Sequence, residues 1–207
     1  MNHKANPHPK FTAALAGAAL FMLAGCGADP ASGPSPDGVD LRGASIGGDF
    51  TLTSNRGTPV SWDDFAGQYR LVYFGFTYCP DICPTDIQRI SQGMKQFEEA
   101  SPERAAKVQP IFISVDPERD TPAVMDEFVS NFHPRLIGLT GTPEEIEATK
   151  KAFGVQASKD PAGDDGNYNI SHTTFTYLFA PDGAPLGIVP TDRLAAGVAA
   201  ELDQWVR

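Results

Sequence analysis

The sequence has little positive charge and no cluster of basic residues. It contains 16 Lys and Arg residues against 26 Asp and Glu residues, a formal net charge of −10 at pH 7. Loss of residues 1–25, which hold two lysines and no acidic residue, would make the charge −12. Proteins that bind nucleic acid carry a basic patch, and attraction to anionic lipid also needs positive charge. We therefore exclude nucleic acid as a partner. We also exclude electrostatic attraction as the force that holds the protein at a membrane.

The N-terminal region lacks an apolar run long enough to cross a bilayer. Residues 11–23 are apolar but shorter than the roughly 20 residues of a spanning helix, and they lead into Leu23-Ala24-Gly25-Cys26. That tetrapeptide resembles a bacterial lipobox, in which the cysteine is lipidated. We predict a lipoprotein signal peptide over residues 1–25, lipidation of Cys26, and a flexible tether over residues 26–44, which are rich in Gly, Ala, Pro, Ser and Asp.

An ordinary signal peptide cleaved near Cys26 is the alternative. Both interpretations predict an extracytoplasmic location on the periplasmic side, where disulfides can persist. The first interpretation also predicts that lipid anchors the protein to the membrane.

Cysteine is scarce, with three residues in the chain. With Cys26 assigned to the anchor, Cys79 and Cys83 remain as a pair. They follow an apolar run at residues 71–76 that is typical of a buried strand. Beyond Pro84 the apolar residues recur at helical spacing, so we predict a helix with Pro84 at its first position. The helix dipole would then favour thiolate over thiol at both cysteines.

Two thiolates at this spacing suit either of two chemistries. If both lie in the first helical turn they share a face, and if they lie in a loop the sulfurs can still meet at one point. The pair can then form a disulfide or hold one soft metal ion, and both Cu(I) and zinc accept thiolate ligands. A structural disulfide or two inert thiols is the plainer alternative.

The remaining sequence, residues 45–207, has no internal repeat and is the length of one domain with its own core. Its pattern predicts a hairpin followed by alternating strands and helices, which gives an α/β fold with a mixed sheet flanked by helices. The expected strands are 50–53, 60–62, 71–76, 108–115, 136–139, 173–180 and 186–189. The expected helices begin at residues 84, 122, 143 and 191, and residues 156–169 are expected to form a mobile loop.

Histidine is also scarce, and beyond residue 25 the chain has His133 and His172. His133 ends a predicted helix, where a surface imidazolium would complement the dipole. His172 begins a predicted strand directly after the mobile loop. Alone it would be a structural residue, but a two-thiolate site needs one borderline ligand if it is to hold oxidised copper.

Three stretches of the chain resemble the SCO/SenC family, copper-binding proteins that assist assembly of cytochrome c oxidase. They are FGFTYCPDICP at residues 74–84, DPERDTP at residues 116–122, and residues 172–183. The resemblance implies a thioredoxin-like fold with an extra N-terminal hairpin, running from about Phe50 to the C-terminus. It also implies that Cys79, Cys83 and His172 bind Cu(I) and Cu(II), and that the two cysteines form a redox disulfide. Family members often carry Asp before the ligand histidine, where this chain has Ser171.

The resemblance leaves several functions to weigh. The leading hypothesis is a metallochaperone, not an enzyme, that delivers copper to the dinuclear copper centre of cytochrome c oxidase, with the copper-accepting subunit as partner. Other periplasmic copper carriers or thioredoxin-like reductases are further expected partners. The alternative is a thiol–disulfide reductase acting on the oxidase cysteines, although the thioredoxin-type proline is absent before Thr173. A thioredoxin-superfamily peroxidase explains His172 and the paired thiols less well.

Asp116, Arg119 and Asp120 follow a predicted strand, at the sheet edge where α/β proteins place ligands. They could line the site or dock a partner. A capped, salt-bridged loop is the interpretation we favour, because such ion pairs are common and weak.

Overall fold

The computed structural model describes residues 1–2, 33–35, 37–163 and 166–207 of the chain. The chain divides into two units, Met1–Pro30 and Ala31–Arg207. Most of the first unit, including the predicted lipidation site Cys26, lies outside the described residues. Within the described residues, no helix has the length and apolar character needed to span a membrane.

An eight-stranded mixed sheet forms the centre of the second unit, in the order β1-β10-β9-β4-β5-β6-β2-β3. The neighbours β4, β5 and β6 are parallel, and the other described pairings are antiparallel. The strands are β1 (Val39–Asp40), β2 (Thr51–Ser54), β3 (Pro59–Ser61), β4 (Tyr69–Gly75), β5 (Val108–Ser114), β6 (Ile137–Thr140), β9 (Thr176–Phe179) and β10 (Pro185–Val189). This confirms the predicted mixed α/β fold.

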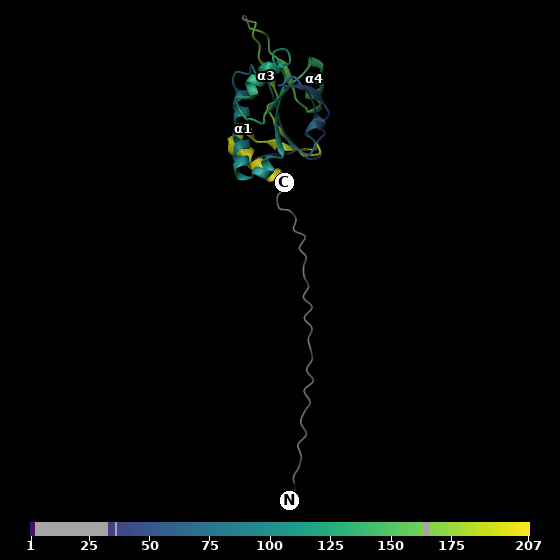
Figure 1. The fold of residues 1–207 in the computed structure, drawn as a ribbon, viewed down its shortest axis with the longest axis vertical. Helices are drawn as coiled ribbons and strands as arrows, with labels where there is room; N and C mark the ends of the chain where they lie inside the picture. Colours follow the sequence, from purple (N-terminus) through teal and green to yellow (C-terminus); the bar gives the residue numbers. More distant parts are fainter. Residues whose placement is uncertain (3–32, 36, 164–165) are drawn as a thin grey trace. The chain divides into compact units, whose positions relative to one another are not determined.

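Helices cover both faces of the sheet (Figure 1). The crossovers β4-α1-β5 and β5-α3-β6 move across the sheet in one direction, so right-handed connections place α1 and α3 on one face. The connection that returns from β6 toward β9 places α4 on the other. The helices are α1 (Ile82–Ala100), α2 (Pro102–Ala105), α3 (Pro122–Val129), α4 (Pro143–Ala152) and α5 (Leu194–Trp205), with short 3-10 turns at Trp62–Phe65 and Thr191–Arg193.

Strand β4 lies at the middle of the sheet and is buried over its whole length. It is parallel to β5 on one side and antiparallel to β9 on the other. Because helices cover both faces, its side chains from Leu71 to Phe74 form a continuous apolar run rather than an alternating one. Each large apolar side chain buried in this way contributes roughly 1.5–3 kcal/mol to stability. The end of β4 is therefore a firm base for the cysteines that follow.

Two helix starts agree with the capping signals in the sequence. Thr121 accepts a hydrogen bond from the Val124 amide at the start of α3. Thr142 and Glu145 form a reciprocal capping box at the start of α4. In contrast, α1 begins at Ile82, so Pro84 is its third residue rather than its first. The proline lacks an amide hydrogen, and any of the first-turn positions tolerates that loss.

The region around His172 differs from the prediction. A single strand at 173–180 was expected, but β8 (Ile170–His172) and β9 are separate strands. β8 pairs with β7 (Ala157–Lys159) in a two-stranded sheet, with His172 opposite Ala157. Part of the expected loop at 156–169 therefore forms the β7–β8 hairpin (residues 157–163 and 166–172). Thr173 and Thr174 lie between β8 and β9. Because β-branched residues favour strands, the sequence pattern showed no sign of the break between the two strands.

The folded unit also begins earlier than the predicted boundary at residue 45. Strand β1 pairs with β10 at the edge of the sheet. Before it, the Ser35 amide donates a hydrogen bond of 2.9 Å to the carboxylate of Glu201, which is fully buried. Gly38 packs so closely on that carboxylate that a side chain would collide with it. A two-residue strand is too short for its hydrophobic pattern to be recognised in the sequence.

Candidate metal centre

Cys79 and Cys83 lie where β4 gives way to α1. Cys79 is half-buried in the turn, whereas Cys83 is the second residue of α1 and is 0% exposed. Both are free thiols. The Cys83 amide donates a hydrogen bond of 3.4 Å to the Cys79 sulfur. The structure has neither predicted arrangement in full, because Cys79 lies in the turn before α1 whereas Cys83 lies in its first turn.

Gly75, the last residue of β4, makes room for the buried thiol. A methyl group in its place would lie 3.1 Å from the Cys83 sulfur and 2.8 Å from the Phe112 ring. Both distances are shorter than ordinary contacts between packed atoms. The glycine between Phe74 and Phe76 is therefore explained by the close approach of Phe112, Tyr73 and Cys83, not by an unusual backbone angle.

His172, the last residue of β8, brings its imidazole to Cys83. Its Nε2 lies 3.3 Å from the Cys83 sulfur. Its Nδ1 lies 2.8 Å from the carbonyl oxygen of Thr173. Because a carbonyl can only accept, Nδ1 carries the hydrogen and the Nε2 lone pair faces the thiol. In the metal-free protein, Cys83 donates its S–H to this lone pair.

Burial sets the charge state of both groups. Burial raises the pKa of the Cys83 thiol well above its usual range, and a hydrogen bond with Cys79 adds to the rise. Burial also lowers the pKa of His172, against the smaller opposing effects of Thr173 and Asp86. The predicted thiolate at the helix start is therefore wrong for Cys83, because desolvation outweighs the helix dipole. A neutral thiol and a neutral imidazole face one another.

The three predicted ligands are adjacent but do not converge on one point. Among the described residues, no group of three or more His, Cys, Asp or Glu side chains is arranged closely enough to hold a metal ion. Cys83 contacts His172, and Cys79 contacts the Cys83 amide. The soft sulfurs and borderline imidazole nitrogen are the donor types that copper accepts. Cys79 would have to turn its sulfur away from that amide to complete the set.

A groove beside the cysteines opens the site to solvent. It encloses about 340 Å³ and lies between the cysteine turn and β8. Its lining residues are Cys79, Pro80, Asp81, Ile82, Asn169, Ile170, Ser171, His172 and Thr174. Tyr78 and Ile82 stand exposed beside it. Cys79 is thus reached from outside, whereas Cys83 lies behind it.

Ser171 does not take part in orienting the imidazole. Its hydroxyl donates 3.3 Å to Asp160 across the hairpin, and the residue is exposed. Successive side chains of a strand point in opposite directions, so Ser171 faces away when His172 faces Cys83. The acceptor that fixes the His172 ring is the Thr173 carbonyl, which is present whatever residue stands at position 171.

Three neighbours of the site were missed from the sequence. Tyr73 and Phe76 place their rings edge-on to His172, with centroids 6.4 and 5.9 Å away. The Tyr73 hydroxyl donates 3.2 Å to Asp86, a buried residue whose pKa is raised by burial. Asp86 lies three residues after Cys83 on α1, and this spacing on the inward face is the signal that could have found it.

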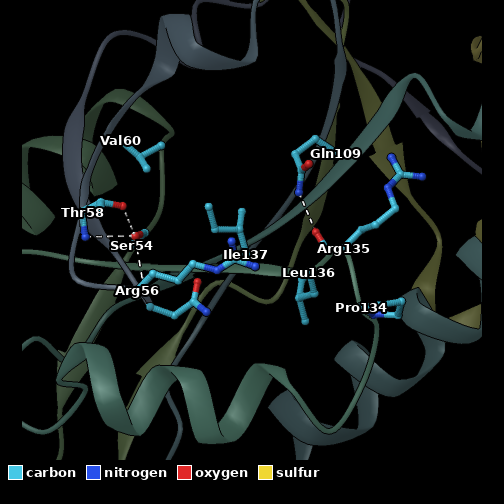
Figure 2. A pocket seen from close by; sticks show the side chains of 10 residues that line it. Ser54, Arg56, Thr58, Val60, Gln109, Pro134, Arg135, Leu136 and Ile137 are labelled. Atoms are coloured by element: carbon cyan, nitrogen blue, oxygen red, sulfur yellow. Dashed lines mark hydrogen bonds between the residues drawn. The ribbon is translucent and has the colours of Figure 1, made fainter.

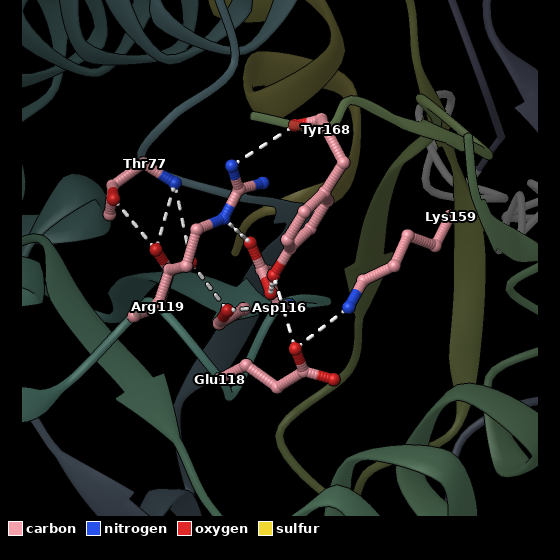
Figure 3. Close-up of polar contacts among 8 residues, drawn as sticks. Thr77, Asp116, Glu118, Arg119, Lys159 and Tyr168 are labelled. Atoms are coloured by element: carbon pink, nitrogen blue, oxygen red, sulfur yellow. Dashed lines mark hydrogen bonds and ion pairs between the residues drawn. The ribbon is translucent and has the colours of Figure 1, made fainter. Parts of the chain in front are cut away.

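The motif at residues 116–120 is the salt-bridged loop that we favoured, and its two aspartates are buried. Asp116 accepts hydrogen bonds from Arg119 and from the Tyr168 hydroxyl (Figure 3). Asp120 accepts from the amide and hydroxyl of Thr77. None of the three motif residues Asp116, Arg119 and Asp120 lines the groove beside Cys79.

A second pocket lies at the opposite ends of the strands (Figure 2). It encloses about 350 Å³ between the β2–β3 hairpin and the start of β6. Its Arg135 is already held by Glu98 and by the carbonyls of Ala105 and Val108. Next to it, His133 is buried rather than on the surface as predicted, and contacts Glu98 at 3.3 Å. We assign this region a structural role.

Comparison with known proteins finds relatives that are described as Sco proteins. The mitochondrial SCO2 homolog of Bos taurus is 47% identical over 144 residues, which cover 69% of this chain and 53% of the relative. The chain thus spans about half the length of the curated relatives it matches. A structure of Bradyrhizobium japonicum ScoI with copper bound matches with a TM-score of 0.71 and 40% identity, covering 78% of this chain and 99% of that one.

A third match is BsSco, described as having a disulfide switch and as a member of the Sco family of cytochrome c oxidase assembly proteins. It aligns with a TM-score of 0.58 and 27% identity, over 82% of this chain and 98% of that one. These matches confirm the predicted thioredoxin-like architecture.

The predicted location is contradicted by the same comparisons. The extracytoplasmic, lipid-anchored location on the periplasmic side was inferred from residues 11–26, which lie outside the described residues. The curated relatives from cattle, human and yeast are mitochondrial proteins, and a lipid-anchored periplasmic protein does not fit a mitochondrial type. That prediction is therefore wrong by these findings.

The family assignment has independent support, because the SCO1/SenC family model matches residues 39–207. The chain belongs to the SCO1/SenC family.

Proposed function

We propose that this protein is a copper metallochaperone that delivers copper to the dinuclear centre of cytochrome c oxidase through Cys79, Cys83 and His172. One observation carries the proposal: the lone pair of a neutral imidazole faces a buried thiol at 3.3 Å. Thiol exchange does not require an imidazole there, whereas a site that is to hold Cu(II) does. Relatives with copper bound add support, as does the suitability of thiolate for Cu(I) and of imidazole for Cu(II).

The side chains of Cys79, Cys83 and His172 each change a contact when copper is loaded. Cys79 and Cys83 each give up a proton to solvent, since a thiol must be deprotonated to ligate a metal. His172 exchanges the S–H hydrogen bond for the copper ion at Nε2, while its Nδ1–H stays on the Thr173 carbonyl. Cys79 turns away from the Cys83 amide to supply the second sulfur. The copper-accepting oxidase subunit then takes the ion through the open groove beside Cys79.

The test is His172→Ala, expressed at the normal level in cells that lack the wild-type protein. Ser171→Ala is the matched control, because Ser171 is the neighbouring residue and its hydroxyl bonds to Asp160 rather than to the imidazole. We expect His172→Ala to lower oxidase copper content and activity, and the control to leave both unchanged. Full activity of His172→Ala at limiting copper would overturn the chaperone function.

A thiol–disulfide reductase is the second candidate. The free, adjacent thiols of Cys79 and Cys83 favour it, as does the disulfide switch described for one relative. Cys79 thiolate would attack a partner disulfide and form a mixed disulfide. Cys83 would then attack the Cys79 sulfur, releasing the partner as a dithiol and leaving a Cys79–Cys83 disulfide for a thioredoxin-like reductase to reduce. This function needs both cysteines but tolerates His172→Ala, so the same experiment separates the two candidates.

A further inference from the structure

The β5–α3 loop (residues 115–121) reaches the cysteine side of the site through Asp120. This carboxylate is 0% exposed and lies at the C-terminal end of the central strands. It accepts hydrogen bonds from the Thr77 amide at 3.2 Å and the Thr77 hydroxyl at 2.6 Å. It also accepts from the hydroxyl of Ser114, the last residue of β5. Thr77 directly follows the buried Phe76 and opens the turn that carries Cys79, so Asp120 fixes where that turn begins.

The same loop reaches the histidine side through Asp116 and Arg119. Asp116 is 2% exposed and accepts the Tyr168 hydroxyl at 2.9 Å. Arg119 forms an ion pair with Asp116 and donates to the Tyr168 carbonyl at 3.0 Å. Its guanidinium also lies 3.6 Å from the centre of the Tyr168 ring. Both ends of Tyr168 are therefore held by one loop, four residues before His172 (Figure 3).

Tyr168 is enclosed from its other side by the hairpin itself. The Lys159 ammonium lies 3.9 Å from the ring centre, so the ring contacts two cations. Lys159 also pairs with Glu118 at 2.7 Å, on the solvent side of the cluster. Cation–ring contacts gain strength when they are withdrawn from water. The buried contact with Arg119 is therefore the stronger of the two.

The β7–β8 hairpin depends on such contacts for its position. Among the described residues, β8 pairs with β7 and with no strand of the eight-stranded sheet. An isolated two-stranded ribbon is marginally stable in water. Its base is tied by hydrogen bonds between Gln156 and Thr173, and its outer part by Tyr168. Ile170 of β8 is also buried in the core, so without the Tyr168 contacts the strand that carries His172 would be held by that one side chain and at its base.

We propose that Asp116, Arg119 and Tyr168 are positioning residues that hold the His172 imidazole against Cys83. The inference rests on the proposed function for its purpose, copper binding, but the positioning itself is a property of the metal-free protein. One loop fixes both halves of the site: Asp120 sets the cysteine turn, and Asp116 with Arg119 sets the histidine strand. The distance between His172 Nε2 and the Cys83 sulfur is therefore set by the β5–α3 loop, which supports both sides of the site.

The test compares two carboxylate-to-amide substitutions, each at a residue whose side chain contacts the Tyr168 hydroxyl. Asp116→Asn alters the buried acceptor of the Tyr168 hydroxyl and leaves Arg119 facing a new donor. Glu118→Gln is the matched control, because Glu118 lies 3.4 Å from the same hydroxyl but its side chain is 61% exposed. Tyr168→Phe is a milder third variant that removes one hydroxyl and keeps the ring contacts, in case Asp116→Asn fails to fold.

The first measurement uses nitrogen NMR of the His172 ring in the metal-free full chain at fixed pH. The wild type and Glu118→Gln should show one tautomer, with hydrogen on Nδ1. Asp116→Asn and Tyr168→Phe should show averaging of the two tautomers. A purely structural role would lower the melting temperature without changing these signals. Unchanged ring signals in both folded variants would overturn the proposal.

The second measurement is competition titration with Cu(II) and with Cu(I). Groups that orient a metal ligand typically affect affinity roughly 10–100-fold. We expect a loss of that order for Cu(II) in Asp116→Asn, with Cu(I) and the control little changed. Equal affinities for Cu(II) in Asp116→Asn and the control would count against the proposal. If the wild type itself bound no copper, the proposed function would fail, while the ring signals would still decide the positioning role.

Discussion

Strand β4 and the β7–β8 hairpin supply the two halves of the site, and they differ in how they are held. β4 is buried throughout and hydrogen-bonded to a strand on each side. β8 pairs with one short strand outside the main sheet, and its middle residue Ser171 is exposed. Local opening is easiest where few apolar contacts and few paired strands support the backbone. The sulfur half of the site is therefore rigid, and the imidazole half is the part able to move.

Ligand chemistry follows the same division. Thiolate suits both oxidation states of copper in a mixed sulfur–nitrogen site, whereas the imidazole matters chiefly for Cu(II). Sulfurs carried on a firmly supported backbone, with a detachable imidazole, would let one site hold copper in either state. The predictions below test this contrast between the two halves.

The largest expected effect is loss of metal binding when the rigid half is damaged. Cys79→Ala or Cys83→Ala should abolish tight binding of both Cu(I) and Cu(II), because neither remaining pair of ligands keeps two sulfurs. His172→Ala should retain far more affinity for Cu(I) than for Cu(II). Competition titrations of the purified proteins measure both. Equal losses for the two ions in His172→Ala would contradict the division of labour.

Global stability should depend on β4 far more than on exposed aromatic residues nearby. Phe74 is fully buried and packs on Phe153 and Tyr177. Phe74→Ala should lower the free energy of unfolding by about 3–5 kcal/mol. Phe175→Ala is the control, since Phe175 meets the same Tyr177 but is 50% exposed. Denaturant unfolding measures both, and a similar loss in the two variants would refute the assigned rigidity of β4.

The smallest effect is a pH dependence from the imidazole half. Burial lowers the pKa of His172 below 6.5 in the folded protein. As pH falls through that value, the unfolded chain binds a proton before the folded one, so His172 contributes stability at neutral pH that is lost on acidification. One proton accounts for at most about 1.4 kcal/mol per pH unit.

The pH measurement is the difference between wild type and His172→Gln in metal-free protein from pH 7.5 to pH 5. A difference is needed because burial raises the pKa of Asp86 and Asp120, and their contributions have the opposite sign. The stability of the variant should fall less steeply than that of the wild type. Parallel curves would show that His172 titrates normally, and hence that it is not held in the buried position.

Much of the fold could be predicted from the sequence because its signals are local. The apolar run after Gln68 and the caps at Thr121 and Thr142 each depend on neighbouring residues, and each marks an element in the structure. Strand β1 and the β7–β8 hairpin could not be predicted, because two or three residues carry no recognisable period. Their pairing partners lie elsewhere in the chain.

Copper ligation by Cys79, Cys83 and His172 stays a prediction, but their proximity could be predicted better than their charge states. The structure places Cys83 beside Cys79 and beside His172. It also shows Cys83 as a buried thiol, which local sequence could not reveal, since desolvation depends on Gly75, Phe112 and the whole surrounding core. The role of Tyr168 was hidden for a similar reason, because its contacts with residues 116–119 connect distant parts of the chain.

The complete burial of Cys83 behind Cys79 has a consequence for the order of events at the site. An incoming sulfur from an acceptor that approaches along the groove meets Cys79 first. On the proposed function, Cys79 is displaced first, the detachable imidazole next, and Cys83 last. Copper transfer is then a stepwise ligand substitution along the groove. The ion gains a sulfur ligand from the acceptor before it loses the last cysteine of this protein.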